Sequence, residues 1–541
     1  MSNYQQLISN LFNISTQTIN KLNVNKQYIV GLFLFLYMRK GVLFFKHKEN
    51  KLSSLLFILP YIGKTIKSKL YDETLKLERS LNLNSKIRLN LNKESKDAKN
   101  IYTIKEMPDN PTENVITRFD YMNAKRNQEK ISGIIYNGDS YSTEINAVYN
   151  KYSKTNPLHA DLYPEIRYME IEIVNMCKSL YKGSLFSCGS VTSGGTESLL
   201  LTCLTYRDYC KHHHNITNPT IIGFKTIHPA FDKAAHYFNI TIIKVNTLKE
   251  MRQKINSNCI CIVGSAPDYP YGLIDPIREM AEIAKKYKVN FHVDACMGGF
   301  LIPFIDKFSY INFDLDGITS ISMDTHKYGY SPKGSSVLLF SHLKYKKFQH
   351  FINKDWCGGV YATPTIQGSK PGGLIAATWA TLLLRGRNNY VETSTKINSN
   401  LKYIVSTFNR SSTKNDLYII GKPELNIIAF GSETLNIYLV INEMKKNGWT
   451  LSVMQNPPAF HFCLTEVHTE DMCSKFCADL YYATNIVSQI TKKNKNKPKL
   501  EGTLAIYGSE NNMEKTTFID EVIHDYIYLL SQENIAFRYF C

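Results

Sequence analysis

Lys327 stands where the amine of a lysine could act as a nucleophile. It follows a short run rich in β-branched residues, at 318–323, and precedes a turn rich in glycine, serine and proline, at 329–336. This order predicts a lysine at a strand end that faces a cleft. The ordinary lysine pKa is about 10.4, and desolvation and neighbouring cations lower it enough for an imine to form with a carbonyl cofactor. A surface lysine in a loop is the ordinary alternative, so other residues must decide.

A segment at 189–197 combines glycines with hydroxyl side chains, directly before an apolar helix predicted at 198–209. The N–H groups of a first helical turn are unpaired, and the helix dipole is positive at that end. The segment therefore predicts a cradle for an anion such as phosphate. Many helices begin in this way and bind nothing, so this signal alone is weak.

Two further polar side chains follow predicted strands. Asp294 ends an apolar run at 289–293, and a carboxylate buried there needs a cation. A protonated pyridine nitrogen is one such partner, and the pairing turns the ring into an electron sink; a helix-capping role is the alternative. His228 precedes Pro229 and could stack on a flat ring, although a capping or core histidine is equally compatible with the sequence.

Strand-like and helix-like segments alternate around these residues. Strands are predicted at 220–224, 240–245, 259–265, 289–294 and 317–323, and helices at 166–180, 198–209, 229–238 and 276–287. This alternation predicts an α/β domain on a largely parallel sheet, with ligands at the carboxyl ends of the strands.

Composition narrows the class of protein. The 541 residues suffice for two or three domains, and the formal charge of +17 raises the question of nucleic-acid binding. The lysines are dispersed or mixed with asparagine, as at 90–100 and 492–499, without interleaved aromatic residues. We interpret the excess charge as a solvated surface with some attraction to anionic lipid or a phosphorylated substrate, and expect no nucleic acid.

The cysteines and histidines give no metal signature. None of the 12 cysteines forms a Cys-x-x-Cys pair, and several lie in apolar runs, as reduced core cysteines do. The run at 212–214 is three histidines, but neighbours on a helix point in different directions, so a solvated helix end is expected. A reducing compartment and no zinc site are predicted.

The most apolar stretch lies near the N-terminus, at 28–45. Its length would just cross a hydrocarbon core, but Arg39 and Lys40 interrupt it. A membrane anchor and an amphipathic packing helix both stay open. If the stretch spans, the basic residues after it leave the remaining chain in the cytosol. It has no small-residue cleavage site of a secretory signal.

Three separated motifs resemble those of pyridoxal-phosphate enzymes of the group II decarboxylase superfamily. They are Val-Thr-Ser-Gly-Gly-Thr-Glu-Ser at 191–198, His-Val-Asp-Ala at 292–295, and Asp-Thr-His-Lys-Tyr-Gly-Tyr-Ser-Pro-Lys-Gly-Ser-Ser at 324–336. The stretches at 132–136, 156–161, 361–369 and 449–461 are more narrowly similar to the sphingosine-1-phosphate lyase family. The resemblance covers about residues 125–510.

The resemblance implies a fold-type I, aminotransferase-like architecture. A large domain with a mostly parallel central sheet is expected at 151–390, and a smaller C-terminal α+β domain at 391–541. Residues 1–60 would form an anchor in the endoplasmic reticulum membrane, and 61–150 a helical segment with a substrate loop. A homodimer with shared active sites, whose catalytic part faces the cytosol, is also implied.

Site residues are implied position by position, with pyridoxal 5'-phosphate as the cofactor and no metal. Lys327 would form the Schiff base; the cofactor would also be held by Asp294 at the pyridine nitrogen, His228 on the ring, Gly195 and Thr196 at the phosphate, His326, and Gly368 and Ser369 from the other subunit. Tyr136, Asn156, His159 and Lys333 would meet the phosphate and amino-alcohol end of the substrate. Tyr136 and Lys333 are also candidate catalytic groups. Lys370 replaces the arginine usual in the family, which puts a contact near the interface in question.

The implied activity is cleavage of the C2–C3 bond of sphingosine 1-phosphate or a related phosphorylated long-chain base. The products would be a long-chain aldehyde and phosphoethanolamine. Tyr136, Lys333 or the substrate phosphate could move the protons, and the sequence does not choose among them. An amino-acid decarboxylase is the first alternative. A catalytically silent membrane scaffold is the second, although such a scaffold would not need Lys327 and Asp294.

Overall fold

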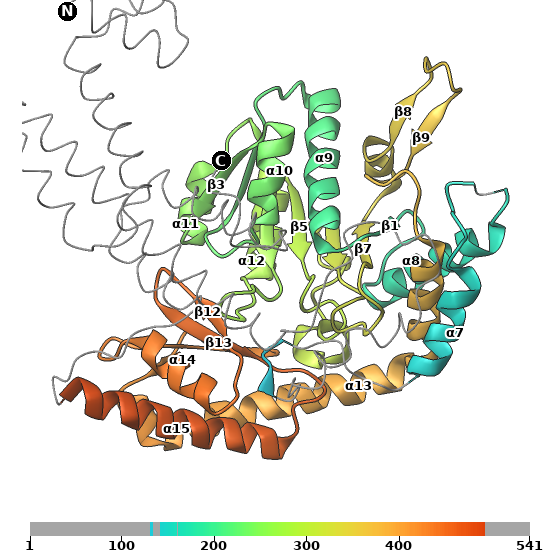
Figure 1. The fold of residues 1–541 in the computed structure, drawn as a ribbon. Coiled ribbons are helices and arrows are strands. Elements are labelled where there is room, and N and C mark those ends of the chain that lie inside the picture. The colour runs from blue at the N-terminus through green and yellow to red at the C-terminus, as the bar shows by residue number, and fades with distance from the viewer. Residues whose placement is uncertain (1–129, 134–140, 160, 493–541) are drawn as a thin grey trace, which may run out of the picture. The chain divides into compact units, whose positions relative to one another are not determined.

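The computed structural model describes residues 130–133, 141–159 and 161–492 (Figure 1). These residues all lie in one compact unit of the chain, Glu106–Asn511. The apolar stretch at 28–45 and the candidate site residue Tyr136 lie outside the described residues. Across the described ranges, no helix is both long enough and apolar enough to cross a membrane.

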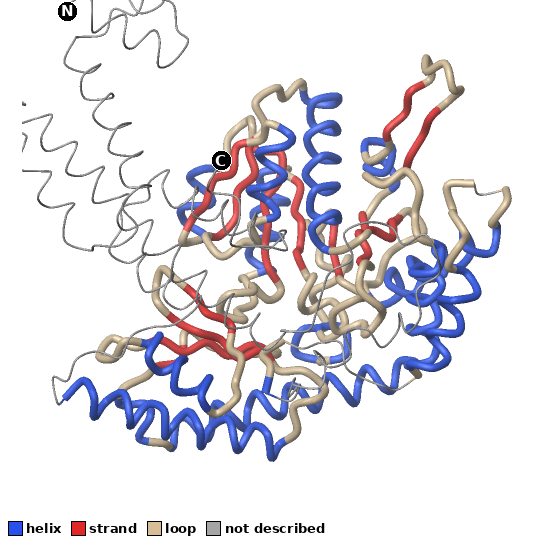
Figure 2. The backbone as a smooth tube through the Cα atoms, in the orientation of Figure 1, coloured by secondary structure: helices blue, strands red, loops and turns tan. Residues whose placement is uncertain are grey.

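A seven-stranded sheet forms the centre of the larger domain, in the order β1-β7-β6-β5-β4-β2-β3 (Figure 2). Its strands are β1 (Cys188–Thr192), β2 (Thr220–Phe224), β3 (Thr241–Val245), β4 (Cys259–Ser265), β5 (Asn290–Asp294), β6 (Ser320–Met323) and β7 (Ser336–Phe340). β7 runs antiparallel to both of its neighbours, and all other neighbouring strands of this sheet pair in parallel. The predicted largely parallel sheet is confirmed, although the sequence prediction did not contain β1 and β7.

Helices cover both faces of this sheet (Figure 1). They are α8 (Pro164–Leu180), α9 (Gly195–His214), α10 (Ala230–Phe238), α11 (Leu248–Lys254) and α12 (Ile277–Tyr287). Alternation along β2 separates the faces: Ile221 packs in the apolar cluster of α9 and α10, and Ile222 packs in the cluster of α8 and α12. The histidines at 212–214 are the exposed end of α9, as predicted.

A smaller C-terminal part follows the long helix α13 (Gly372–Arg410), which is interrupted at Gly386. It contains a four-stranded antiparallel sheet in the order β10-β11-β13-β12. Its elements are β10 (Tyr418–Ile419), β11 (Ile427–Gly431), α14 (Ile437–Lys446), β12 (Ser452–Met454), β13 (Ala459–Cys463) and α15 (Glu470–Lys492). The α+β character of this part is as predicted. The predicted boundary at 390 falls inside α13, and the domain limits stay a prediction.

Helix α7 (Ser142–Tyr152) and the strands β8 (Phe351–Asn353) and β9 (Tyr361–Thr363) lie at the periphery. Helix α7 packs on the start of α13, where Gly372 and Gly373 allow a close approach: a Cβ at Gly372 would lie 2.0 Å from Oγ1 of Thr155. Strands β8 and β9 form a hairpin that projects from the larger domain (Figure 1).

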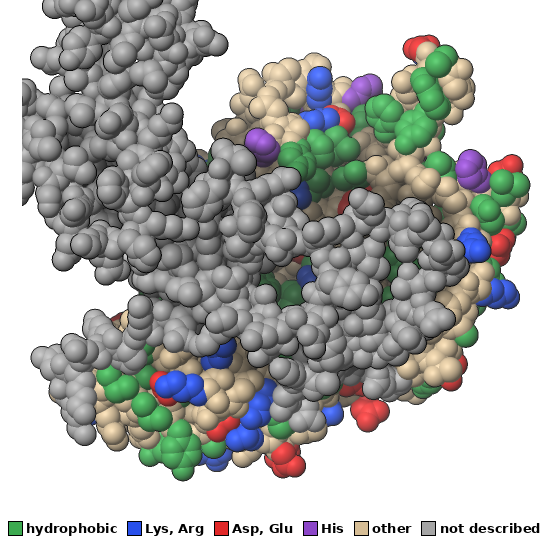
Figure 3. Space-filling view, viewed as in Figure 1, with side chains coloured by type: hydrophobic (Ala, Val, Ile, Leu, Met, Phe, Trp, Pro, Cys, Tyr) green, Lys and Arg blue, Asp and Glu red, His purple; other side chains and the backbone are tan. Residues whose placement is uncertain are grey.

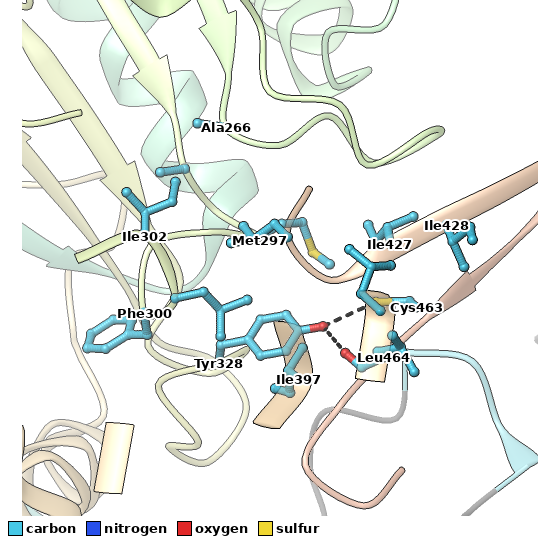
Figure 4. Close-up of a cluster of buried hydrophobic side chains, with 14 of the residues drawn as sticks. Ala266, Met297, Phe300, Ile302, Tyr328, Ile397, Ile427, Ile428, Cys463 and Leu464 are labelled. Atoms are coloured by element: carbon cyan, nitrogen blue, oxygen red, sulfur yellow. Dashed lines mark hydrogen bonds between the residues drawn. The ribbon is translucent and has the colours of Figure 1, made fainter. Parts of the chain in front are cut away.

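The two sheets meet in a shared apolar core (Figure 4). Met297, Phe300 and Tyr328 from the larger domain are buried against Ile427 and Leu464 of the smaller part. The hydroxyl of Tyr328 donates to the carbonyl oxygen of Leu464, 2.6 Å away. Because Tyr328 follows Lys327 in sequence, this core fixes the backbone of the candidate lysine.

Residues 130–133 attach to the smaller part. The N–H of Ser132 donates to the carbonyl of Thr450 at 2.9 Å, and the N–H of Gly133 donates to the carbonyl of Cys463 at 2.9 Å. The chain thus reaches the edge of the candidate site three residues before Tyr136.

Candidate active site

A cavity of about 520 Å³ lies at the carboxyl ends of the parallel strands. Ser265, Asp294 and Ser322 stand level across β4, β5 and β6, so the loops after these strands open on the same side. Six predicted cofactor residues line the cavity together: Gly195, Thr196, His228, Asp294, His326 and Lys327. Further lining residues include Asp268, Cys296, Asp324, Ser132, Gly133, Ser452, His461 and Cys463.

Lys327 forms an ion pair inside the cavity. Its Nζ lies 2.9 Å from Oδ2 of Asp324, whose side chain is only 1% exposed. Burial lowers the pKa of Lys327, but the Asp324 carboxylate, with Cys296 and Asp294, outweighs burial, so this pKa is raised above its ordinary value. The prediction that neighbouring cations lower the pKa is therefore wrong, because the nearest charged group is a carboxylate.

The start of α9 has glycine geometry that suits the predicted anion cradle. Gly194 has φ 149°, a conformation that L side chains rarely adopt, and a Cβ on Gly195 would lie 2.8 Å from Oδ2 of Asp324. Both positions therefore require glycine. The Glu197 carboxylate braces the cradle by accepting the N–H of Ser193 at 2.6 Å and the N–H of Ile366 at 3.1 Å.

Asp294 is a buried acceptor at the end of β5. Its Oδ1 accepts the N–H of Cys296 at 3.0 Å and the hydroxyl of Ser322 at 3.4 Å. Only 7% of the residue is exposed. This carboxylate therefore matches the predicted partner of a cationic ring nitrogen.

Two of the three histidines that line the cavity, His228 and His326, have fixed tautomers when neutral. Nδ1 of His228 accepts the N–H of Ala230 at 3.1 Å, and Nδ1 of His326 accepts the N–H of Ser335 at 3.0 Å. The proton of each neutral ring therefore sits on Nε2. In His326 that nitrogen lies 3.6 Å from Oδ2 of Asp324, and burial lowers the pKa of His326.

The predicted residues Asn156, Ser369 and Gly368 form a second group. Nδ2 of Asn156 donates to Oγ of Ser369 at 3.1 Å, and Oδ1 of Asn156 accepts the N–H of Lys370 at 3.2 Å. None of these residues is among the described residues that line the cavity of their own chain. The same holds for the exposed His159 and for Lys333, whose Nζ donates to the carbonyl of His326 at 3.0 Å.

Lys370 is buried and makes two polar contacts despite replacing the usual arginine. Its Nζ lies 2.6 Å from Oε1 of Glu170 and 3.1 Å from the carbonyl oxygen of Val191 at the end of β1. The residue is 6% exposed. A lysine at position 370 therefore suffices, in place of the arginine, to hold the loop after Ser369 against the larger domain.

Comparisons with known proteins agree with this site. The pyridoxal-dependent decarboxylase conserved domain matches residues 121–432. Sphingosine-1-phosphate lyase 1 of Rattus norvegicus is 41% identical over 479 residues, which cover 85% of this chain and 80% of the rat protein. The chain belongs to the sphingosine-1-phosphate lyase family, within the pyridoxal-dependent decarboxylases.

Other members of the sphingosine-1-phosphate lyase family are similarly close. The lyase of Dictyostelium discoideum is 37% identical over 411 residues, which cover 74% of this chain and 76% of that protein. The solved sphingosine-1-phosphate lyase structure from Burkholderia pseudomallei superposes with a TM-score of 0.69 at 32% identity, covering 74% of this chain and 99% of that one. A glutamate decarboxylase of Lactobacillus brevis, at 18% identity and TM-score 0.62, shares the fold. The predicted fold class is thereby confirmed.

The cofactor of the sphingosine-1-phosphate lyase family is pyridoxal 5'-phosphate, and the donors of this cavity fit it. A lysine amine, a glycine-formed cradle at a helix start and a buried carboxylate suit its aldehyde, its phosphate and its ring nitrogen in turn. Lys327, Gly195, Thr196 and Asp294 are the residues that would hold it.

Sequence reasoning assigned no role to several polar residues of the cavity, among them Asp324 and His461. Asp324 follows β6 as Asp294 ends β5, so the same strand-end signal could have identified it. His461 lies within β13 and comes from the smaller part. A buried histidine between two phenylalanines gives no local signal of a binding site. For metals, the described part of the chain contains no group of three or more His, Cys, Asp or Glu side chains that could hold an ion.

Proposed function

We propose that this chain is a pyridoxal-phosphate-dependent lyase that cleaves the C2–C3 bond of sphingosine 1-phosphate or a related phosphorylated long-chain base. The observation that carries the proposal is the meeting of Lys327, the Gly194–Gly195 cradle and buried Asp294 in one cavity. The likeness to the rat lyase supplies the substrate class. Phosphoethanolamine and a long-chain aldehyde are the products.

The reaction balances without an oxidant or a second substrate. The C3 hydroxyl loses its proton, its oxygen becomes the aldehyde oxygen as the C2–C3 bond breaks, and C2 gains a proton. Pyridoxal phosphate supplies a ring that accepts the electron pair left on C2. Lys327 would bind the cofactor aldehyde, Asp294 would keep the ring nitrogen protonated, and His228 would cover the ring.

The substrate phosphate needs cationic and hydroxyl donors. Tyr136, Asn156, His159 and Lys333 are the residues proposed to supply them. Desolvation lowers the pKa of Lys333. This lysine could therefore take up a proton when a dianionic phosphate approaches, because the phosphate favours the charged amine.

A homodimer would complete the site. Asn156 and Ser369 are bonded to each other but do not belong to the described lining of their own cavity. Supply of these residues to the cavity of a second copy would account for their absence from the described lining of their own cavity. The β8–β9 hairpin supports such an assembly, because it exposes the large apolar side chains of Phe351, Ile352, Trp356 and Val360 (Figure 3).

Attachment to the endoplasmic reticulum membrane, with the catalytic part in the cytosol, also belongs to this proposal. Its support is the apolar stretch at 28–45 with its basic flank. The full chain and a chain lacking residues 1–60 would be expressed side by side. Only the full chain is expected to sediment with membranes; equal sedimentation would contradict the anchor.

The central test uses the purified protein with bound cofactor. A visible imine absorbance is expected, and a phosphorylated long-chain base should yield aldehyde and phosphoethanolamine in equal amounts. Lys327→Ala should lose both the absorbance and the activity, whereas the control Lys333→Ala should keep the absorbance and lose activity. A colourless protein, an imine band that survives Lys327→Ala, or rapid release of carbon dioxide from amino acids would overturn the proposal.

A further inference from the structure

His461 is a buried histidine that lines the active-site cavity from the smaller part of the fold. It is 0% exposed and lies on β13, where alternation places it on the same side as Cys463, another residue of the cavity wall. Its ring packs edge-on against Tyr269, with centroids 4.8 Å apart and planes at 83°. The ring is therefore held in a single orientation.

One hydrogen bond fixes the tautomer of this ring. Nδ1 of His461 lies 2.9 Å from the carbonyl oxygen of Pro270. A carbonyl oxygen only accepts hydrogen bonds, so Nδ1 carries the hydrogen. Burial lowers the pKa of His461 to about 4, and the bond to Pro270 only partly offsets this, so the ring is neutral at pH 7. Nε2 of His461 is consequently a lone-pair acceptor.

This acceptor lacks a partner within the described residues. Nε2 of His461 is buried and makes no hydrogen bond there. Leaving a buried acceptor unpaired typically costs about 1–3 kcal/mol. An unpaired acceptor on a residue of the cavity wall would be explained by a ligand that packs against this residue and supplies the donor.

The donor can be identified from the chemistry of the proposed substrate. Its phosphate dianion has no hydrogen to donate, its alkyl chain has no polar group, and its amine is consumed by the cofactor. The ring N–H of the cofactor is taken by Asp294. Among the groups of the substrate, the C3 hydroxyl is the donor that remains.

We infer that Nε2 of His461 accepts a hydrogen bond from the C3 hydroxyl of the bound base, and so selects substrates that carry this hydroxyl. The inference rests on the proposed function. It gives the smaller part of the fold a direct role in orienting the bond that is cleaved, because the hydroxyl is attached to one of the two carbons of that bond.

The test compares the substrate with its 3-deoxy counterpart, which cannot be cleaved. The kcat/KM is measured for the substrate, and the Kd of the 3-deoxy compound is read from the change it causes in the cofactor's visible absorbance. The variants His461→Asn and His461→Phe both remove Nε2. The Asn amide can still reach Pro270, and the Phe ring can still pack on Tyr269.

We expect both variants to lose about 10- to 100-fold in kcat/KM, the equivalent of one lost buried hydrogen bond, with the 3-deoxy Kd changed less than about threefold. His461→Gln, whose amide oxygen can reach the place of Nε2, should recover part of the loss. The inference would be overturned if a folded variant lost affinity for the 3-deoxy compound as much as it lost kcat/KM for the substrate. It would also be overturned if a folded variant kept the kcat/KM of the wild type.

His468→Gln is the matched control. His468 is buried in the same part of the fold, burial likewise lowers its pKa to about 4, and it is not among the described residues of the cavity wall. His468→Gln should not change the kcat/KM of the substrate relative to the Kd of the 3-deoxy compound. A wild-type protein that releases no aldehyde would defeat the proposed function instead, which separates the two failures.

Discussion

The Lys327–Asp324 pair sets the charge of the amine that must bind the cofactor. Asp324 holds Lys327 protonated, whereas a neutral amine is the form that attacks an aldehyde. The strand-end position of Lys327 was predictable from the sequence. The sign of its pKa shift was not, because Asp324 precedes it by three residues and only the folded loop brings the two side chains together.

Asp324→Asn should therefore lower the pKa of Lys327. Cofactor-free protein would be mixed with pyridoxal phosphate, and the rate at which the imine absorbance appears would be measured as a function of pH. The midpoint of this profile should move to lower pH by at least about one unit, since each unit reflects roughly 1.4 kcal/mol of lost pairing. Asp268→Asn, a change at another buried carboxylate of the cavity wall, is the control and should leave the midpoint in place.

Asp275 makes stability depend on pH. Burial, together with the nearby carboxylates of Asp268 and Asp294, raises the pKa of this carboxyl to about 8. The hydrogen bond from the N–H of Ser265, at 2.7 Å, lowers this pKa and only partly offsets the rise. The folded chain thus keeps a proton that the unfolded chain releases above pH 4. The stability contributed by this group is present at acid pH and is lost as pH rises from about 4 to about 8.

Asp275→Asn should remove this loss, because an amide oxygen can still accept the N–H of Ser265 but never ionises. We expect the variant to exceed wild type in free energy of unfolding at pH 8 by on the order of 1 kcal/mol or more. Urea titrations at pH 5 and pH 8 would measure it. The exposed Asp306→Asn makes the same change of net charge and is the control; an equal gain there would attribute the effect to surface charge.

Several strands with a strong apolar pattern were predicted from the sequence, although the apolar β7 was not, and neither was β1, whose pattern is mixed. β2 and β4 occur at the predicted residues, since both are short apolar runs between turns. β1 begins with Cys-Gly-Ser and does not look like a strand. It is a strand because β7 supplies its hydrogen bonds and α8 and α9 cover it, which are contacts with distant parts of the chain.

Tyr328 connects the lysine loop to the smaller part of the fold. Tyr328→Phe would remove the bonds from its hydroxyl to Leu464 and from Asn426, whose Nδ2 lies 2.7 Å from that hydroxyl. We expect a loss of about 1–3 kcal/mol in unfolding free energy, with faster release of the cofactor on dilution because the backbone of Lys327 is less constrained.

Tyr345→Phe is the matched control for this element. Tyr345 is equally buried and donates to Oδ1 of Asn290 at 2.9 Å, among residues that do not line the cavity. It should lose similar stability without faster cofactor release. Equal release rates in the two variants would show that Tyr328 contributes stability alone.

At the scale of the whole molecule, contacts between distant positions were not predictable from local patterns. Neither periodicity nor the resemblance indicated that Asn156 meets Ser369, 213 positions away. The resemblance implied that Gly368 and Ser369 serve the site of a second copy, and this stays a prediction. The sharing of sites between copies can be tested by mixing two inactive chains. One carries Lys327→Ala. The other carries Gly368→Val, which places a branched side chain at the loop position proposed to reach the cofactor phosphate, with a Cβ 2.7 Å from the hydroxyl of Tyr361.

Mixed and re-associated, these chains should regain about a quarter of wild-type activity. Half of the dimers would contain one chain of each kind, and each of those would have one intact site of two. Either chain re-associated alone should stay inactive. If each site were built within one chain, mixing would restore nothing, and a fully active Gly368→Val would remove the loop from the site.

Glu197 has a consequence for how two such sites behave together. One of its carboxylate oxygens holds the cradle loop at Ser193, and the other holds Ile366, two residues before Gly368. In a dimer with shared sites, a single side chain would join the cradle of one site to the loop that serves the other. Filling one site would then change the affinity of the second, and by thermodynamic linkage the effect would be reciprocal. The two sites of the dimer would bind the cofactor cooperatively, and Glu197→Gln would weaken that cooperativity.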